Sequence, residues 1–170
     1  MIKLESLSKR FKFKEILSNC TFSFSSKGLY ILTGDNGIGK TTLLNILSLN
    51  DSNYSGEIFF DEEKVDFSNS KLINKLKNNI EYLDQKNNFI CYLDYLENYN
   101  LDTYLFKDTI NSDISIKSQS LSDGEKIILL IDRCILRNKP IVLLDEVTSF
   151  LDDKNFILVM KKIEELSKKS

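Results

Sequence analysis

The sequence contains no histidine and no tryptophan, and it has a single proline among 170 residues. Because histidine is absent, no imidazole can act as a catalytic base, a metal ligand or a charge that switches near neutral pH. The three cysteines, Cys20, Cys91 and Cys134, are odd in number, far apart and free of any C-x-x-C pattern. This arrangement argues against a disulfide framework or a cysteine zinc site, and we expect reduced, mostly buried thiols.

Charge of one sign is not in excess, and long apolar runs are missing. There are 23 Lys and Arg against 25 Asp and Glu, for a formal net charge of −2, so a nucleic-acid-binding surface is not expected. No apolar run approaches the roughly 18 residues that a membrane-spanning helix needs, and the first residues lack the apolar core of a signal peptide. We therefore expect one cytoplasmic domain that a partner would have to hold at any membrane.

Glycine is also scarce, yet three of the six glycines fall within residues 34–41, which match the phosphate-loop pattern G-x-x-x-x-G-K-S/T. An apolar strand is expected just before it, at 29–33, and a helix just after it, from 42 to 47. Backbone N–H groups of such a loop form an anion cradle at the helix N-terminus. Lys40 can then reach the β- and γ-phosphates, and the hydroxyl of Thr41 can bind Mg²⁺.

The loop predicts binding of a nucleoside triphosphate, with an unrelated glycine-rich turn as the weaker alternative. The residues expected at the nucleotide are Gly34, Asp35, Asn36, Gly37, Ile38, Gly39, Lys40, Thr41 and Thr42.

A second motif consists of four apolar residues, 141–144, followed by Asp145 and Glu146. The apolar run is typical of a strand buried in a parallel sheet, which brings both carboxylates to the edge where such sheets bind ligands. Asp145 can hold Mg²⁺ there, and Glu146 can polarise a water that attacks the γ-phosphate. Acids that follow a buried strand also occur in plain surface turns, but the phosphate loop in the same chain favours the catalytic interpretation.

The remaining chain alternates strand and helix patterns. Strands are predicted at 2–5, 21–25, 55–60 and 80–83, and helices at 71–78, about 121–137 and 153–167. Apolar residues between 90 and 112 have irregular, mostly helical spacing, which indicates a small helical subdomain at about 86–112. Residues 1–85 and 113–170 would then form the core of a single domain.

These motifs, together with Leu-Ser-Asp-Gly-Glu at 121–125, resemble the ATP-binding cassette (ABC) family from about residue 2 onward. The resemblance implies an α/β P-loop NTPase fold. It has a RecA-like core, an N-terminal antiparallel β subdomain and a small helical subdomain. Family members continue beyond the final helix into a central strand that ends in a histidine. The resemblance therefore implies that the C-terminal part of the core is missing from these residues, which would leave a gap in the sheet.

The resemblance also implies roles for residues outside the two motifs. Phe11 matches the aromatic residue that stacks on adenine, with Phe13 as a substitute and a place in a hairpin core as the ordinary alternative. Gln85 matches the glutamine that touches Mg²⁺ or the attacking water. Ser122 and Gly124 match signature residues that bind the γ-phosphate of ATP on the opposing protomer.

The function implied is that of an ATP-hydrolysing subunit of an ABC transporter, with ATP and Mg²⁺ as cofactors and Glu146, Lys40 and Gln85 as catalytic residues. Two protomers, identical or different, would form a head-to-tail dimer that drives a separate membrane permease from the cytoplasmic face. The 35 residues between Gln85 and Leu121 leave room for only a compact helical subdomain, which favours a small exporter.

Two alternatives remain open. One is a non-transport ABC ATPase. The other is an ATP-binding module without turnover, suggested by the missing histidine and by Asp123, where the family usually has glycine. Turnover by this chain alone is not decided by the sequence.

Overall fold

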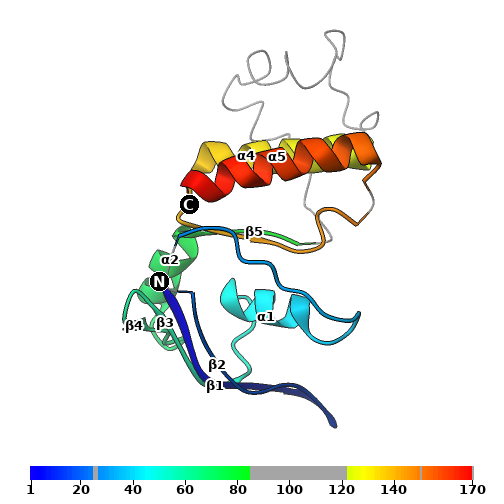
Figure 1. The fold of residues 1–170 in the computed structure, drawn as a ribbon. Helices are drawn as coiled ribbons and strands as arrows, with labels where there is room; N and C mark the ends of the chain where they lie inside the picture. Colours follow the sequence, from blue (N-terminus) through cyan, green and yellow to red (C-terminus); the bar gives the residue numbers. More distant parts are fainter. Residues whose placement is uncertain (25–26, 85–121, 150, 170) are drawn as a thin grey trace.

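The computed structural model of the chain describes residues 1–24, 27–84, 122–149 and 151–169 (Figure 1). The predicted helical subdomain at 86–112 and Gln85 lie outside the described residues. The elements, in chain order, are β1 (Ile2–Phe11), β2 (Lys14–Phe24), α1 (Lys40–Leu47), β3 (Ser55–Phe60), β4 (Glu63–Lys64), α2 (Ser70–Asn78), β5 (Ile80–Leu83), α4 (Asp123–Arg137), β6 (Ile141–Leu144) and α5 (Asp153–Lys169).

The first four strands form an antiparallel sheet in the order β2-β1-β3-β4. Strand β1 carries a bulge at Ser6, whose φ is 50°, and its register to β2 shifts between Leu4 and Leu7. The shift changes which side chains point inward, so the buried positions are Leu4 before the bulge and Leu7 after it. Gly56 lies against the bulge with a φ of +96°, and a Cβ there would be 2.5 Å from the Ser6 carbonyl oxygen.

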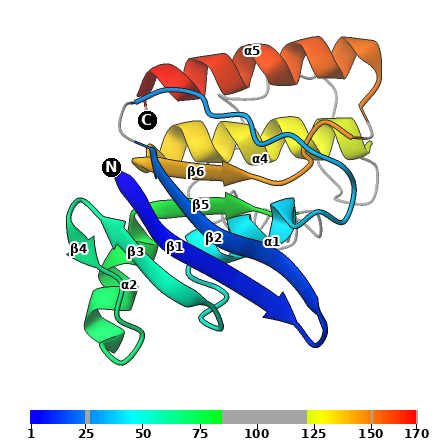
Figure 2. The same ribbon diagram turned by 60° about the horizontal axis from the view of Figure 1, so that its bottom comes forward.

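Strands β5 and β6 form a parallel pair, and helices cover both of its faces (Figure 2). Ile141 and Leu143 pack in the same apolar cluster as α1 and the antiparallel sheet. Val142 and Leu144 pack against the cluster that includes buried residues of α4 and α5. The period of two along β6 therefore divides four apolar residues between two clusters, as expected for a strand buried on both faces.

A buried acid joins β5 to helix α4 and the turn that follows it. Glu81 is 4% exposed at its side chain and pairs with Arg133 at 3.1 Å, Arg137 at 3.0 Å and Lys139 at 3.3 Å. Nearby, Cys134 is fully buried, and desolvation together with the Glu81 charge raises the pKa of its thiol to about 12. The thiol therefore stays protonated, in agreement with the expectation for this cysteine. Cys20 is partly buried, and Cys91 lies outside the described residues.

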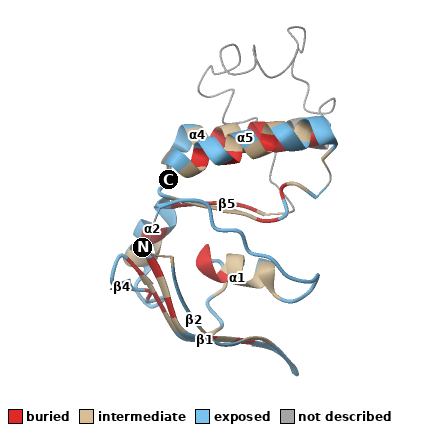
Figure 3. Ribbon diagram, viewed as in Figure 1, coloured by how far each residue is buried: buried red, intermediate tan, exposed pale blue. Residues whose placement is uncertain are grey.

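The strand predicted at 29–33 is wrong. These residues adopt no regular structure, and Leu29, Ile31 and Leu32 are 50%, 73% and 47% exposed (Figure 3). A strand needs a neighbour for its N–H and C=O groups, but among the described residues β5 and β6 pair only with each other. Among the described residues, the other predicted elements are confirmed; β1 and β2 are longer than expected, and the short strand β4 was not predicted.

Candidate functional site

The glycine-rich loop leads directly into α1. The helix begins at Lys40, and Gly39 precedes it with φ 119° and ψ 15°. The first intrahelical bond runs from the Leu43 N–H to the Gly39 carbonyl at 2.9 Å. The N–H groups of the first turn have no partner within the helix, so they and the helix dipole make this end favourable for an anion.

Lys40 places its ammonium within the loop. Its Nζ donates to the carbonyl of Gly34 at 2.8 Å and to that of Asp35 at 2.9 Å. The side chain thus folds back over the loop that the sequence predicts to bind phosphate. A phosphate entering the loop would offer charged oxygens in place of these neutral carbonyls, and charge-assisted hydrogen bonds are the stronger kind.

A cavity of about 190 Å³ lies in front of the loop. The hairpin of β1 and β2 contributes one wall, the loop and α1 another, and the segment after β6 a third. Its lining residues are Phe11, Ile16, Gly37, Gly39, Lys40, Thr41, Thr42 and Glu146. Phe11 lines this cavity, whereas Phe13 is 97% exposed and does not.

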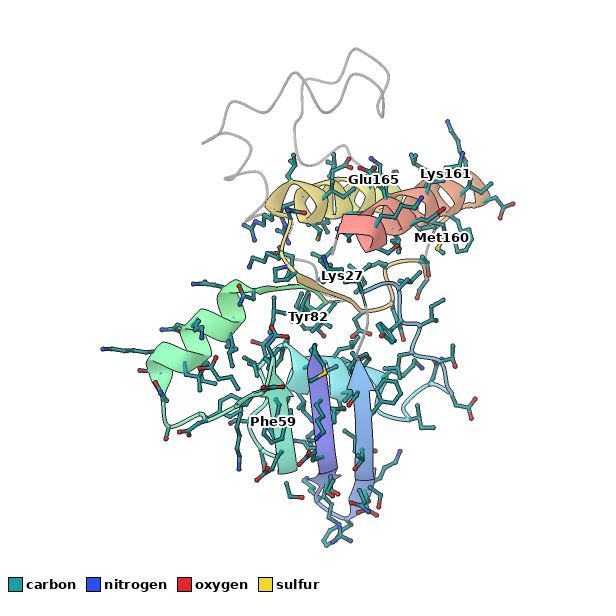
Figure 4. The ribbon with its side chains drawn as sticks, turned by 60° about the vertical axis from the view of Figure 1, so that its left-hand side comes forward. Lys27, Phe59, Tyr82, Met160, Lys161 and Glu165 are labelled. Carbon is teal, nitrogen blue, oxygen red and sulfur yellow. The ribbon has the colours of Figure 1, made fainter. Side chains whose placement is uncertain are left out.

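The two acids after β6 differ in environment. Asp145 is 3% exposed, its N–H donates to the Leu83 carbonyl at 2.9 Å, and its carboxylate accepts from the Tyr82 hydroxyl at 3.5 Å. Burial, followed by the charges of Asp145 and Asp84, raises the pKa of Tyr82, which is labelled in Figure 4, well above its usual value. Its hydroxyl therefore remains a neutral donor. Glu146 is exposed, and a φ of 53° turns the chain so that this residue lines the cavity.

The signature residues lie elsewhere. Ser122 is exposed, and its carbonyl accepts from Lys126 N–H at 3.0 Å at the start of α4. Gly124 is buried against the side chain of Asn155, which in turn bonds to Asp152, the residue that caps α5. Neither signature residue lines the cavity, so the structure brings together the loop, Phe11 and Glu146 but not the signature.

Sequence reasoning missed Ile16, which lines the cavity and approaches Gly39 so closely that a Cβ there would be 2.3 Å from its Cγ2. Nothing local in the sequence marks Ile16, because it reaches the loop only through the fold of the hairpin. The hairpin also touches the loop through Lys14, whose Nζ donates to the Gly37 carbonyl at 3.5 Å.

The oxygen donors at this site fit Mg²⁺. Thr41 offers a hydroxyl at the cavity, and Asp145 offers a carboxylate after the end of β6, although it is not among the residues that line the cavity. Among residues 1–24, 27–84, 122–149 and 151–169, no group of three or more Asp, Glu, Cys or His side chains could enclose a metal. A site with few protein oxygens suits Mg²⁺, which keeps several waters and is commonly completed by substrate phosphates.

Comparison with known proteins gives one consistent result. The family model described as ABC transporter matches residues 17–149. The galactose/methyl galactoside import ATP-binding protein MglA of Clostridium perfringens is 29% identical over 99% of this chain and 36% of its own length. The macrolide export ATP-binding/permease protein MacB of Campylobacter jejuni is 28% identical over 98% of this chain and 29% of its own length. The chain thus spans about a third of the length of these relatives.

Comparison of the fold with solved structures gives the same family. The MJ0796 ATP-binding cassette, in a dimeric structure bound to ADP and phosphate, superposes with a TM-score of 0.75 at 23% identity. That match covers 99% of this chain and 83% of the cassette. The structural likeness establishes an α/β P-loop NTPase fold of the ABC type, and the family model establishes descent. The chain belongs to the ABC transporter family.

Proposed function

We propose that this chain binds and hydrolyses ATP as the nucleotide-binding subunit of an ABC transporter. The observation that carries the proposal is the cavity itself, since it gathers Lys40, Thr41 and Glu146 with the aromatic Phe11. These residues come from three separate parts of the chain: β1, the start of α1 and the segment after β6. Each has a chemical type that a nucleotide or its hydrolysis requires.

In the proposed reaction, the N–H groups of residues 34–41 and the Lys40 ammonium bind the β- and γ-phosphates. Phe11 stacks on the base. Thr41 and Asp145 would hold Mg²⁺, which when bound neutralises charge on the phosphates, and Gln85 is assigned to the same metal or to the attacking water by resemblance. Glu146 accepts the proton of that water, for which its position at the cavity and its exposed carboxylate are suited.

We further propose that two protomers enclose the nucleotide head to tail. The cavity of about 190 Å³ is smaller than the roughly 300–1,000 Å³ of clefts that bury a whole ligand, so a bound nucleotide would keep part of its surface outside this chain. Ser122 and Gly124 would act on the nucleotide of the opposing protomer, a role consistent with their position away from this chain's own cavity. The partner protomer could be identical or different.

In this proposal, ATP binding and hydrolysis by the dimer drive transport through a separate membrane permease, which the dimer contacts at the cytoplasmic face. No helix among the described residues combines the length and hydrophobicity that crossing a bilayer requires. The helical subdomain predicted at about 86–112, between core segments 1–85 and 113–170, lies outside the described residues and stays a prediction. Its short length favours export, although the relatives include an import protein and an export protein.

Replacement of Glu146 by glutamine tests hydrolysis. We expect Glu146→Gln to keep its ATP affinity within about threefold of the original protein and to lower phosphate release at least a hundredfold, the range of a lost general base. Glu62→Gln is the matched control, because Glu62 is also exposed with a positive φ, 69°, but lies in the β3–β4 turn. If the unmutated chain binds ATP but releases no phosphate, the alternative of an ATP-binding module without turnover is favoured. Asp123, where the family usually has glycine, is the residue that suggests this alternative.

A further inference from the structure

We propose that Lys9 is a positioning residue for base recognition. Its buried ammonium lies over one face of the Phe11 ring and leaves the ring free to present its other face to a purine. The Lys9 Nζ is 4.7 Å from the ring centroid of Phe11. The ring is 50% exposed and lines the cavity, so it is supported on one side and accessible on the other. The proposal rests on the proposed nucleotide function.

The strand geometry accounts for this contact. Beyond the bulge at Ser6, the buried positions of β1 are Leu7 and Lys9. Phe11 follows on the same face by the period of two, at the exposed end of the strand. Residues two apart on a strand are neighbours on that face. A lysine at an inward position is therefore brought beside the ring of the residue that ends the strand.

Lys9 is held by groups that do not belong to the nucleotide loop. Its side chain is 2% exposed, and Nζ lies 2.7 Å from one Asp51 oxygen and 2.9 Å from the other. Nζ also donates to the Asn53 carbonyl, and the Asn53 N–H donates to Asp51 at 2.9 Å. Asp51 follows α1, and its own N–H bonds to the Asn45 carbonyl of that helix at 3.1 Å. The ammonium therefore has a fixed place, because moving a buried paired charge is unfavourable.

The charge has a second consequence for the ring. A cation on one face draws π-electron density toward itself, and this attraction is stronger when the cation is desolvated. The opposite face then repels the π-cloud of a stacked base less. Lys9 should thus both orient Phe11 and strengthen its stacking on a purine, without touching the nucleotide.

The test compares the affinities of the full chain for ATP and for inorganic tripolyphosphate, which lacks the base. Because tripolyphosphate also lacks the ribose, its dissociation constant divided by that of ATP measures the nucleoside-dependent part of binding, in which the base stacks on Phe11. We expect Phe11→Ala to lower this ratio about tenfold and Lys9→Met about fivefold, with tripolyphosphate affinity unchanged in both. In the doubly substituted chain, Lys9→Met should add nothing to Phe11→Ala. Lys3→Met is the matched control, since the Lys3 Nζ lies 5.9 Å from the ring centroid of Phe59, which is labelled in Figure 4, and neither residue lines the cavity.

Two results would overturn the proposal while leaving nucleotide binding intact. One is an unchanged ratio in Lys9→Met, and the other is an equal loss of affinity for both ligands, which would mean that Lys9 only supports the fold. If the unmutated chain binds neither ligand, the proposed function itself fails. Should Lys9→Met not fold, Asp51→Asn releases the ammonium from its anchor. A twofold lower ratio in that variant is expected, and an unchanged one would contradict the role of Lys9.

Discussion

Substitution of Gly39 by alanine should be the most damaging small change in the phosphate loop. Two features of the structure act against a side chain at this position. The backbone has a φ of 119° with a ψ of 15°, a conformation that residues with a Cβ rarely adopt. In addition, the new Cβ would lie 2.3 Å from the Cγ2 of Ile16 on strand β2.

The expected loss of stability is the sum of a backbone cost and a packing cost. An unfavourable backbone conformation of this kind costs of the order of 1–3 kcal/mol. Ordinary carbon contacts begin near 3.4 Å, so Ile16 would have to move by about 1 Å, and overpacking of this sort costs about 1–3 kcal/mol more. We expect Gly39→Ala to lower the free energy of unfolding by about 2–6 kcal/mol. Gly37→Ala should cost only about 1–2 kcal/mol, because Gly37 has a φ of 77° but open space around it.

Urea unfolding followed by circular dichroism measures both variants, and a double-mutant cycle separates the two terms. Ile16→Ala removes Cγ2, so its combination with Gly39→Ala should be less destabilising than the sum of the two single changes by about 1–3 kcal/mol. ATP affinity should fall in Gly39→Ala, since both residues line the cavity. If Gly39→Ala were no worse than Gly37→Ala, or if the cycle gave no coupling, the close approach of β2 to the loop would be refuted.

Two further predictions concern charges away from the cavity. Glu81→Gln leaves three cations around a neutral amide and should lower the free energy of unfolding by about 3 kcal/mol. Glu164→Gln, which alters an exposed pair, should change it by less than about 1 kcal/mol, and equal effects in urea unfolding would contradict a stabilising role for the buried ion pairs of Glu81. Partial burial alone would raise the pKa of Asp51, but hydrogen bonds from Lys9 and from the Asn53 N–H, with the Lys9 charge, lower it below its usual 3.8. The stability contributed by this depressed pKa is present above pH 3.8 and is lost as the pH falls through the lower folded-state value. The unfolding temperature should therefore fall more steeply with decreasing pH in the original chain than in Asp51→Asn. Parallel plots of unfolding temperature against pH would contradict a stabilising pairing of Lys9 with Asp51.

The parts of the fold that could be predicted from sequence are those in which local spacing and chemistry agree. The loop at 34–41 and the apolar run at 141–144 each carry their own signal, because backbone conformation and burial are specified within a few residues. The strands at 80–83 and 141–144 have the predicted bounds, and Asp145 and Glu146 follow the second of them as expected. The helical subdomain and Gln85 lie outside the described residues and stay predictions.

Other features depend on contacts between residues far apart in the chain. Residues 29–33 have the apolar character of a strand, but a strand also needs a neighbour, and among the described residues none pairs with them. The sequence left Phe11 and Phe13 as alternatives, and the hairpin geometry brings only Phe11 to the cavity. The burial of Lys9 depends on the bulge at Ser6, whose position is not visible in the alternation of side chains alone.

The sequence by itself determined the phosphate-loop motif and the acidic strand end, because these are short patterns in which each residue type has a local physical role. The tertiary structure alone decided which side chains meet at that chemistry. The approach of Ile16 to Gly39, the pairing of Lys9 with Asp51 and the pairing of Glu81 with α4 all join residues that are distant in sequence. Such contacts depend on register, strand parity and helix packing, and these are properties of the assembled fold.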